Sequence, residues 1–576
     1  MKQIRYYQII TAFCCLLLIS CGIDKNLKKG EKFLSLGEYN DAADQFKQAY
    51  TKTPPKEREN RGKLALKMAR CYNKINATPK AVNAYRNAIR YNQASLDDRL
   101  AYARLLLKNG EYKQAEKEFR ILVDSMPDNI LAQNGLRSAQ MTPGWKKAGS
   151  RYQVKKMDVF TSRRADYSPM LLGDEYEQIY FTSTRNDAQG DELSGITGTK
   201  AGDIFYSEKD DKGKWSRPEA IATGLNTDYD EGACCFTPDG KEMYLTQCVT
   251  DPASPRFAQI VTSSRSDAAW GKVQKLEITQ DTLSTYAHPA ISPDGEWLYF
   301  VSDMPGGMGG YDIWRVRITP SGLGGVENLG APINTPGDEM FPTFRPNGEL
   351  YFSSNGHIGM GGLDIYIARI DEKTQQYKIE HPGYPLNSEA DDFGMTFEGP
   401  HNRGFFSSNR KDGRGYDHIY SFLNPEIVTT MKGWVYEKDG YELPAAQVMV
   451  VGNDGTYRKL PVKSDGSFTL PIHPEVDYLV MASCKGFLNH KEELRIDSAK
   501  ESKEYVLQFP LASISAPVLI DNIFYDFDKA TLTPASTQAL DKLVALLKEN
   551  SHVTIELSAH CDYKGNSEYN KRLSQR

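Results

Sequence analysis

The stretch HPAISPDGEWLYFVS, residues 288–302, holds two apolar segments on either side of the turn sequence Pro293-Asp294-Gly295. Proline followed by Asp-Gly or Asn-Gly supports a tight turn between two strands, and aromatic residues favour strands. The repeat therefore predicts a series of antiparallel hairpins. Related stretches occur at 168–183, 232–247, 341–354 and 393–408.

A second repeated phrase follows each hairpin and ends in an apolar strand. Its copies are AGDIFYS (201–207), FAQIVTS (257–263, the weakest), GGYDIWRV (309–316), GGLDIYIA (361–368) and GYDHIYSF (415–422). The aromatic residues Tyr180, Tyr244, Tyr299, Tyr351 and Phe405 lie 64, 55, 52 and 54 residues apart. This spacing fits four-stranded blades with a loop insertion. Residues 150–424 thus resemble the PD40 or WD40-like β-propellers of TolB-like proteins, with five blades. The strand at 153–160 either closes the ring or starts a sixth blade.

Aspartates recur at the start of the second phrase, and they raise the question of a metal or catalytic site. They are Asp203, Asp312, Asp364 and Asp417. A group that recurs once per blade indicates a structural turn or cap, because a catalytic group would break the repeat. His288 and Pro289 also occupy a repeated position. We therefore expect no enzyme activity, no metal and no cofactor. A cluster of acids and histidine in the channel that the blades do not share would favour an enzyme instead.

Residues 21–145 carry a helical repeat. LGEYNDAADQFKQAY (36–50) returns as NGEYKQAEKEFRILV (109–123), and KAVNAYRNAIRYN (80–92) fits the same pattern. The shared positions are Ala42/Ala81/Ala115 and Phe46/Tyr85/Phe119. Alanines let paired helices approach, and the aromatic rings fill the gap to the next pair. The region resembles about three tetratricopeptide (TPR) units, an α-solenoid that usually presents a concave face to a partner protein. A passive spacer is the alternative.

The composition is that of a globular chain of several domains. Of 576 residues, 40% are hydrophobic and 25% are charged, and the net charge is −5. No basic face or tail indicates nucleic acid as a partner.

The N-terminus has the pattern of a targeting segment. Lys2 and Arg5 precede an apolar stretch that is too short for a secure membrane span. The sequence Leu18-Ile19-Ser20-Cys21 resembles a bacterial lipobox. This resemblance implies a signal peptide at 1–20 and lipidation of Cys21. Among the remaining cysteines, a disulfide involving Cys234, Cys235 and Cys248 is possible in an oxidising compartment, but buried free thiols are the simpler expectation.

Residues 427–512 alternate apolar and polar positions around a D-G-S-F turn. They resemble a carboxypeptidase-regulatory-like β-sandwich of about seven short strands, a module that usually acts as a rigid spacer.

The tail, residues 515–576, begins with FYDFDK (524–529) and continues with a helix that has Leu540, Leu543, Val544 and Leu547 on one face. The strand HVTIELSAHCD (552–562), Gly565 and Asn570-x-x-Leu573-Ser574 follow. This order resembles the OmpA C-terminal family of peptidoglycan-binding domains, an α/β fold. We expect the copy to be C-terminally incomplete, lacking about 50 residues by family resemblance.

The OmpA resemblance implies binding of the diaminopimelate in peptidoglycan stem peptides. A carboxylate pairs with the ammonium of that group, and a guanidinium pairs with its carboxylate. Asp562 takes the carboxylate role, and Asn570 shapes the loop and contacts the peptide. The family arginine corresponds to position 577, so Arg576 is the residue just before it. Cys561 replaces the usual threonine.

Taken together, the domain order resembles Bacteroidetes outer-membrane lipoproteins of the PorE type, which link type IX secretion machinery to peptidoglycan. This resemblance implies a non-enzymatic lipoprotein in the outer membrane, facing the periplasm, with protein partners on the TPR units and the propeller. The alternatives are a glycan-binding or hydrolytic propeller and a TolB-like role in envelope integrity.

Overall fold

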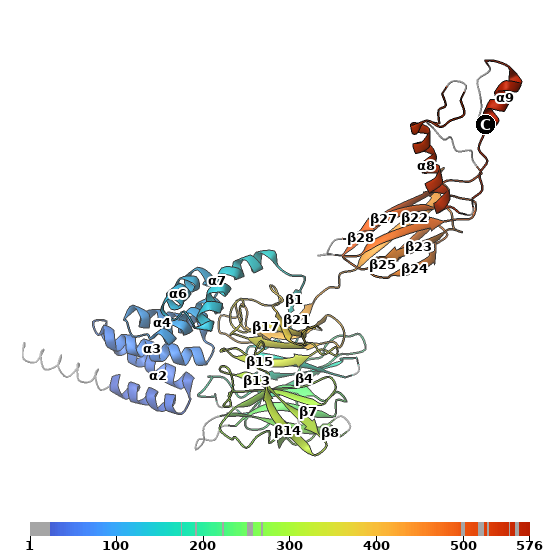
Figure 1. The fold of residues 1–576 in the computed structure, drawn as a ribbon. Helices are drawn as coiled ribbons and strands as arrows, with labels where there is room; N and C mark the ends of the chain where they lie inside the picture. The colour runs from blue at the N-terminus through green and yellow to red at the C-terminus, as the bar shows by residue number, and fades with distance from the viewer. Residues whose placement is uncertain are drawn as a thin grey trace, which may run out of the picture. The chain divides into compact units, whose positions relative to one another are not determined.

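A computed structural model describes residues 23–576 apart from 174, 191–192, 222–223, 250–256, 267–268, 372, 497–501, 516–522, 527–528, 552 and 559–563. The chain divides into two compact units at Pro425 and Glu426 (Figure 1). None of the helices within the described ranges has the length and apolar character needed to cross a bilayer.

The first unit opens with a stack of helices in which each helix contacts the next along the chain (Figure 1). Short loops join the helices, so neighbours pack with their apolar faces together. The bounds are 23–35, α2 Tyr39–Lys52, α3 Arg58–Lys74, α4 Thr78–Arg90, α5 Leu96–Lys108, α6 Tyr112–Ser125 and α7 Ile130–Ala148.

The repeated helical positions form the core of this stack. Ala42, Ala81 and Ala115 are fully buried on α2, α4 and α6, and the aromatic residue four positions later is buried with them in each helix. Phe46 and Phe119 pack against the bare backbone of glycines on neighbouring helices: a Cβ on Gly135 would lie 2.3 Å from the Phe119 ring. The alternation of alanine, aromatic ring and glycine thus sets the spacing of the stack.

The remainder of the first unit forms five antiparallel sheets within the described residues. The first contains β2 Asp166–Leu172, β3 Gln178–Ser183, β4 Asp203–Glu208 and β5 Glu219–Ala220; the second β6 Asp230–Phe236, β7 Glu242–Val249, β8 Phe257–Ser266, β9 Ala269–Trp270 and β10 Gln274–Lys275; the third β11 Tyr286–Ile291, β12 Trp297–Ser302, β13 Asp312–Thr319 and β14 Gly322–Asn328; the fourth β15 Glu339–Phe344, β16 Leu350–Ser354, β17 Asp364–Ile370 and β18 Tyr377–Glu380; the fifth β19 Asp392–Phe397, β20 Arg403–Ser408, β21 His418–Leu423 and β1 Gln153–Lys156.

These sheets close into a ring. The first strand of each sheet contacts the first strand of the next, in the order β2, β6, β11, β15 and β19, and β19 contacts β2 again. The arrangement is propeller-like. Strand β1, which comes from the segment before the first sheet, pairs with β21 at the edge of the fifth sheet, with Gln153 opposite Leu423. The predicted strand at 153–160 thus completes an existing sheet.

The predicted hairpins are present at the centre of the ring. The turn glycines Gly240, Gly295 and Gly348 have positive φ angles between the first and second strands of their sheets. The repeated aromatic residues, from Tyr180 to Phe405, are all at most 7% exposed. They pack in the hydrophobic clusters between adjacent sheets, one in each cluster.

Each innermost strand contains a β-bulge at the same position. The bulge residues all have positive φ, and three of them precede proline. Three of the bulge N–H groups reach hydroxyl groups on the preceding sheet: His288 N–H donates to Thr246 Oγ1 at 2.9 Å, Ser168 N–H to Ser407 Oγ at 2.8 Å and Ala233 N–H to Thr182 Oγ1 at 3.2 Å. These three bulges therefore link neighbouring sheets around the axis. The five bulge residues are Ser168, Ala233, His288, Phe341 and Gly394.

The recurring aspartates mostly act as loop caps, as predicted. Asp203, Asp312 and Asp364 each begin the third strand of a sheet and pair across it with a serine. Their carboxylates accept backbone N–H groups of the preceding loop, at 2.7 Å from Gln189 and from Met360. These contacts hold the loop against the strand.

Asp417 does not belong to this set, which corrects the prediction. Ser408 pairs with His418 at the register position where the other sheets place aspartate. Because Asp417 comes one residue earlier, its carboxylate cannot take the capping position. His418 Nε2 instead contacts Asp412 Oδ2 at 3.0 Å, and Asp412 accepts the backbone N–H of Arg414.

The second unit begins with a β-sandwich. A three-stranded sheet, in the order β25-β22-β28, packs on a four-stranded sheet, in the order β24-β23-β26-β27, through a core that includes Met431, Val448, Val480 and Phe509. The bounds are β22 Thr429–Glu437, β23 Gln447–Gly452, β24 Tyr457–Pro461, β25 Ser467–Ile472, β26 Asp477–Ser483, β27 His490–Arg495 and β28 Lys503–Leu511.

The tail differs from its prediction in one element. Helices α8 Pro534–Glu549 and α9 Ser567–Gln575 are present, but the described part of the expected strand, residues 553–558, is irregular. A strand needs a neighbour to satisfy its backbone groups, and among the described residues no segment pairs with this one. Ser536 is the buried residue of α8, whereas Val544 on its apolar face is 47% exposed.

The glycine–ring contact in the helical stack gives a testable consequence. We expect Gly135→Ala to destabilise the first unit by about 1–3 kcal/mol, because the new methyl group overlaps the buried Phe119 ring. Gly144→Ala on the same helix is the matched control: nothing lies within 4 Å of its Cβ position. This change should leave stability unchanged or raise it by up to about 1 kcal/mol. Urea unfolding followed by circular dichroism measures both, and equal effects would contradict the packing described.

Candidate functional site

Two asparagine side chains fix the start of α9 and the loop before it. Asn566 Oδ1 caps the helix by accepting the Glu568 N–H at 2.9 Å. Asn570 Nδ2 donates to the Lys564 carbonyl at 3.0 Å, across a turn in which Gly565 has a φ of 104°. Asn570 therefore ties the first turn of α9 to the loop before it.

Of the other residues that we predicted to bind peptidoglycan, the structure describes only Arg576. Arg576 is exposed beyond the end of α9, and its N–H donates to the Leu573 carbonyl at 3.3 Å. Asp562 and Cys561 lie outside the described residues, as does the predicted lipidation site Cys21.

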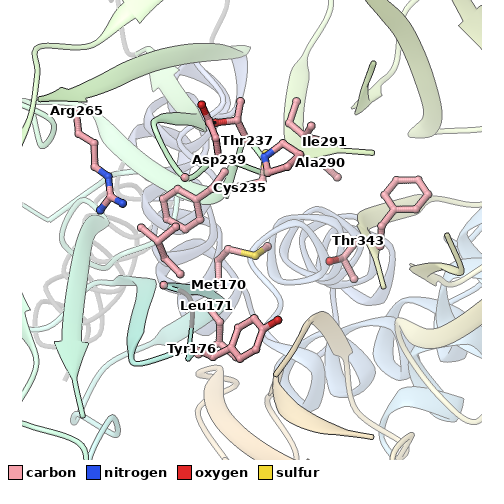
Figure 2. Close-up of a pocket in the computed structure, with 16 residues that line it drawn as sticks. Met170, Leu171, Tyr176, Cys235, Thr237, Asp239, Arg265, Ala290, Ile291 and Thr343 are labelled. Atoms are coloured by element: carbon pink, nitrogen blue, oxygen red, sulfur yellow. The ribbon is translucent and has the colours of Figure 1, made fainter. Parts of the chain in front are cut away.

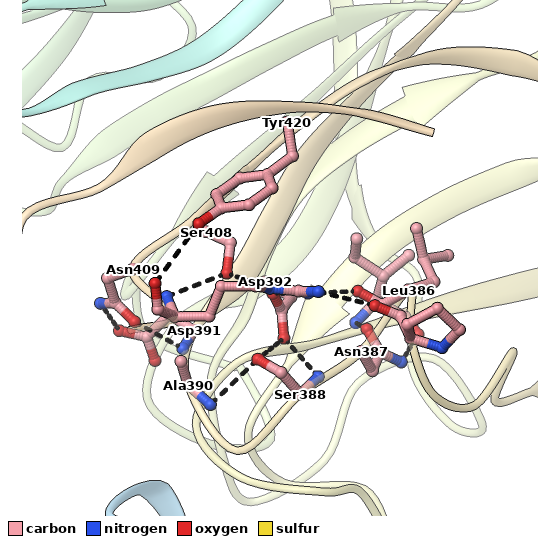
Figure 3. Close-up of polar contacts among 12 residues, drawn as sticks. Leu386, Asn387, Ser388, Ala390, Asp391, Asp392, Ser408, Asn409 and Tyr420 are labelled. Carbon is pink, nitrogen blue, oxygen red and sulfur yellow. Dashed lines mark hydrogen bonds and ion pairs between the residues drawn. The ribbon is translucent and has the colours of Figure 1, made fainter. Parts of the chain in front are cut away.

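A polar junction joins the helical stack to the ring. Lys108 at the end of α5 contacts Asp391 Oδ2 at 2.5 Å and also the Asn76 side chain, and Asn76 Nδ2 donates to Asp391 at 2.8 Å. Asn409 holds Asp391 from the ring side through two hydrogen bonds (Figure 3). Burial alone would raise the pKa of Asp391, but the Lys108 ammonium and the hydrogen bonds from the Leu363 N–H and the Asn76 side chain hold it below its ordinary value.

Helix α7 and the start of α2 extend the junction. Asn134 Nδ2 donates to the Gly356 carbonyl at 2.9 Å, and the Gly359 N–H donates to Ser138 Oγ at 3.0 Å. Trp145 stacks on His381 with ring centroids 4.6 Å apart. At the other end, the Asn40 N–H donates to the Gly195 carbonyl at 3.0 Å. One edge of the helical stack is thus engaged within the chain.

A cavity of about 280 Å³ opens at the far ends of the innermost strands (Figure 2). Met170, Cys235 and Ile291 line its inner part, and Thr237, Asp239 and Arg265 lie toward one side. The Arg265 guanidinium packs over Trp270 at 5.4 Å.

Aromatic rings fill the axis between this cavity and the junction. His288 stacks on Phe341 with centroids 3.7 Å apart, and Phe341 packs on Phe393 at 4.5 Å. The space left among the bulge residues is about 20 Å³. Burial lowers the pKa of His288 to about 3, so its ring is neutral at physiological pH.

Buried carboxylates surround the axis at the junction end of the ring, and their partners differ between sheets. Arg185 pairs with Asp166 at 2.7 Å in the first sheet, and Arg410 pairs with Asp392 in the fifth (Figure 3 shows Asp392 with Ser388). Glu339 instead accepts hydrogen bonds from the neutral groups of Thr335 and Ser354.

Burial raises the pKa of the carboxyls that form no ion pair. Glu231, Glu339 and Asp417 each reach about 7. Glu231 and Glu339 occupy the same position at the start of the innermost strand as Asp166 and Asp392, whereas Asp417 lies outside this repeat. Within the described residues no group of three or more histidine, cysteine or acidic side chains could hold a metal ion. The described cysteines, Cys234, Cys235 and Cys248 among them, are free thiols.

The comparison with protein families bears on the tail alone. Residues 524–576 match the OmpA family. This segment contains FYDFDK, α8, α9 and Asn570, and it is the part of the chain for which the sequence indicated that family. A comparison with curated proteins gave no match.

Solved structures resemble the chain only distantly. An endo-arabinase from Bacteroides thetaiotaomicron is 16% identical, with a TM-score of 0.31, over 50% of this chain and 99% of that one. A protein of unknown function from Dyadobacter fermentans is 14% identical, with a TM-score of 0.29, over 44% and 74%. An α-L-arabinofuranosidase from Lactobacillus brevis is 11% identical, with a TM-score of 0.28, over 50% and 95%. At these scores the likenesses carry no argument about activity.

One repeated set of asparagine residues was not predicted from the sequence. Asn226, Asn334 and Asn387 lie in the loops that lead into β6, β15 and β19, and each side-chain amide pairs with both the N–H and the carbonyl of an isoleucine in the preceding sheet. The signal was the repeated sequence LNT, INT and LNS followed by paired acids at 225–231, 333–339 and 386–392.

The buried Lys108–Asp391 pair should be essential to the first unit. Lys108→Ala leaves Asp391 as an uncompensated buried charge, which we expect to cost about 3–5 kcal/mol. Lys146→Ala is the matched control, because the Lys146–Glu389 pair is 32% and 36% exposed and should contribute at most about 1 kcal/mol. Chemical unfolding gives both values. A loss for Lys108→Ala no larger than for Lys146→Ala would contradict the assignment.

The raised carboxyl pKa values predict that Glu231, Glu339 and Asp417 contribute less to the stability of the first unit as the pH rises from about 5 to 8. In the unfolded chain these carboxyls ionise near pH 4, whereas in the fold Glu231, Glu339 and Asp417 keep their protons up to about pH 7. Their stabilising contribution is therefore present below the unfolded pKa and is lost as the pH passes 7, by up to about 3 kcal/mol for Glu339.

Thermal unfolding between pH 5 and 8 tests this profile. Glu339→Gln mimics the protonated side chain and should flatten the profile, whereas Glu327→Gln, an exposed control on β14, should not. Parallel profiles for the wild type and Glu339→Gln would show that Glu339 is ionised in the fold; this comparison cancels the opposite contribution of His288, whose neutral ring adds stability as the pH rises.

Proposed function

We propose that this protein is a non-enzymatic component of the bacterial outer membrane that binds peptidoglycan. The match of residues 524–576 to the OmpA family carries this proposal. In our interpretation Asp562 grips the ammonium of diaminopimelate, Asn570 shapes the loop, and Arg576 lies beside the position of the carboxylate-binding arginine. The Asn570 contact with Lys564 supports the second of these roles.

The N-terminal half would place the protein between the membrane and partner proteins. Lipidation of Cys21 would anchor it in the outer membrane, facing the periplasm. The TPR-like stack and the propeller would hold the partners, for which type IX secretion components of the PorE type are the first candidates. The polar junction supports a single scaffold, because it joins stack and ring through buried contacts.

A glycan-binding or hydrolytic ring and a TolB-like role in envelope integrity are the other candidates. The repeated positions of the buried acids and of His288 favour structural roles for these groups over catalysis. Co-purifying proteins would distinguish a secretion role from a TolB-like one.

Pull-down on purified peptidoglycan sacculi tests the proposal. We expect sedimentation with sacculi, and we expect Asp562→Ala to abolish it by removing the carboxylate that pairs with diaminopimelate. Asp541→Ala, an exposed acid on α8 outside the motif, is the matched control and should bind like the wild type.

The assay compares the 576-residue chain with both variants. Binding that is lost only with Asp562→Ala supports the proposal. Absence of binding, or equal binding by both variants, would overturn it.

A further inference from the structure

The loop between the second and third strands has nearly the same sequence in the third and the fourth sheet. Residues 302–312 read SDMPGGMGGYD, and residues 354–364 read SNGHIGMGGLD. Both copies contain Gly-Met-Gly-Gly, and both end in the aspartate that begins the third strand. Residues 303–310 are the third-sheet loop and residues 355–362 the fourth-sheet loop.

The same hydrogen bond anchors both loops to their sheets. Met308 N–H donates to Asp312 Oδ2 at 2.5 Å in the third sheet, and Met360 N–H donates to Asp364 Oδ2 at 2.7 Å in the fourth. The two loops have equal length and share three glycines around the methionine. The third-sheet loop is therefore a second copy of the fourth-sheet loop in sequence and in anchoring.

Helix α7 lies on the fourth-sheet loop and binds its peptide groups. Gly359 N–H donates to Ser138 Oγ at 3.0 Å, and Thr142 Oγ1 donates to the Gly359 carbonyl at 3.3 Å. Asn134 Nδ2 donates to the Gly356 carbonyl at 2.9 Å. These three polar residues of α7 are spaced by four positions, so they lie along one face of the helix.

The corresponding surface of the third-sheet loop is open. Met360 is 0% exposed and Gly359 is buried, whereas Met308 is 45% exposed and Gly307 is exposed with the two glycines at 309 and 310. The third-sheet loop thus exposes the groups that a helix covers in the other copy. An exposed methionine beside bare glycine backbone lets a helix approach closely.

The open loop adjoins the contact that α7 already makes. A Cβ on Gly309 would lie 2.3 Å from the Thr335 carbonyl oxygen, and a Cβ on Gly337 would lie 2.5 Å from Gly356 Cα. Segment 335–337 therefore connects the third-sheet loop to the part of the fourth-sheet loop that Asn134 binds. A helix on the third-sheet loop would continue this interface around the ring.

We propose that the third-sheet loop binds an α-helix of a partner protein. This helix would carry small polar side chains at positions i, i+4 and i+8, as α7 does, and would cover Met308 with the apolar residues beside them. Its polar side chains would bind the peptide groups of Gly307, which corresponds to Gly359. The inference rests on the proposed role of the ring in holding partners, and it is independent of peptidoglycan binding by the tail.

A synthetic peptide with the sequence of α7, residues 129–148, is the probe for this surface. A lactam bridge between positions 137 and 141, both exposed on α7, keeps it helical. NMR line broadening of the peptide on addition of the full chain reports binding, for which we expect millimolar affinity. Met308→Asp should weaken binding by about tenfold or more, because it places a charge in the contact. Ile370→Asp, 55% exposed at the end of β17, is the matched control and should bind like the wild type.

A second peptide provides a readout that does not depend on a protein variant. Valine in place of Ser138 and Thr142 removes both hydroxyl groups, so this peptide should bind more weakly to the wild-type chain. Absence of broadening of the α7 peptide, or equal binding of the valine peptide, would overturn the proposal. Binding that Met308→Asp leaves intact would overturn it as well, because the peptide would then occupy another surface. Sedimentation with sacculi is a separate measurement that none of these changes should affect.

Discussion

The pairing of β1 with β21 is the constraint on which the first unit depends. A ring of sheets is stable only if its last sheet is completed, and here the completing strand comes from the segment directly after α7. The same pairing fixes the end of α7 beside the fifth sheet. From that point the helical stack can reach the loops before β17 and β19, where Trp145, Ser138 and Lys108 make their contacts.

The ring and the stack solve the same packing problem in different ways. In the stack, bare glycine backbone receives an aromatic ring, as at Gly135 and Phe119. In the ring, each innermost strand has a bulge with positive φ, and in three of these strands the bulge N–H donates to a hydroxyl group of the preceding sheet. Both solutions are local and repeated. The Lys108–Asp391 junction belongs to neither repeat, because it joins the two parts through a single set of contacts.

The sequence predicted these repeats because they depend on short patterns: turn glycines, aromatic strands and alanine-aromatic helices. It could not predict that one edge of the stack packs on the ring, because Asn76, Lys108 and Asp391 lie far apart in the chain and no repeat links them. The prediction for Asp417 failed for a similar reason. The strand register is set by the Ser408–His418 pair, and the Gly-x-Asp pattern of the sequence does not show this pairing. The irregular stretch at 553–558 has a strand-like composition, but composition alone supplies no pairing partner.

The antiparallel closure also has a mechanical meaning. Gln153 and Leu423 are opposite each other, so the chain enters and leaves the ring at the same end of the β1–β21 pair. A force pulling on these two chain ends would therefore break the hydrogen bonds of the pair one after another, as a zipper opens, instead of loading them all at once. The hydrogen bond from Arg151 Nη1 to the Pro425 carbonyl, 2.8 Å long, lies at the end of the strand pair where this opening would begin. In the function proposed above, tension between membrane and wall would load the β1–β21 pair in this unzipping geometry.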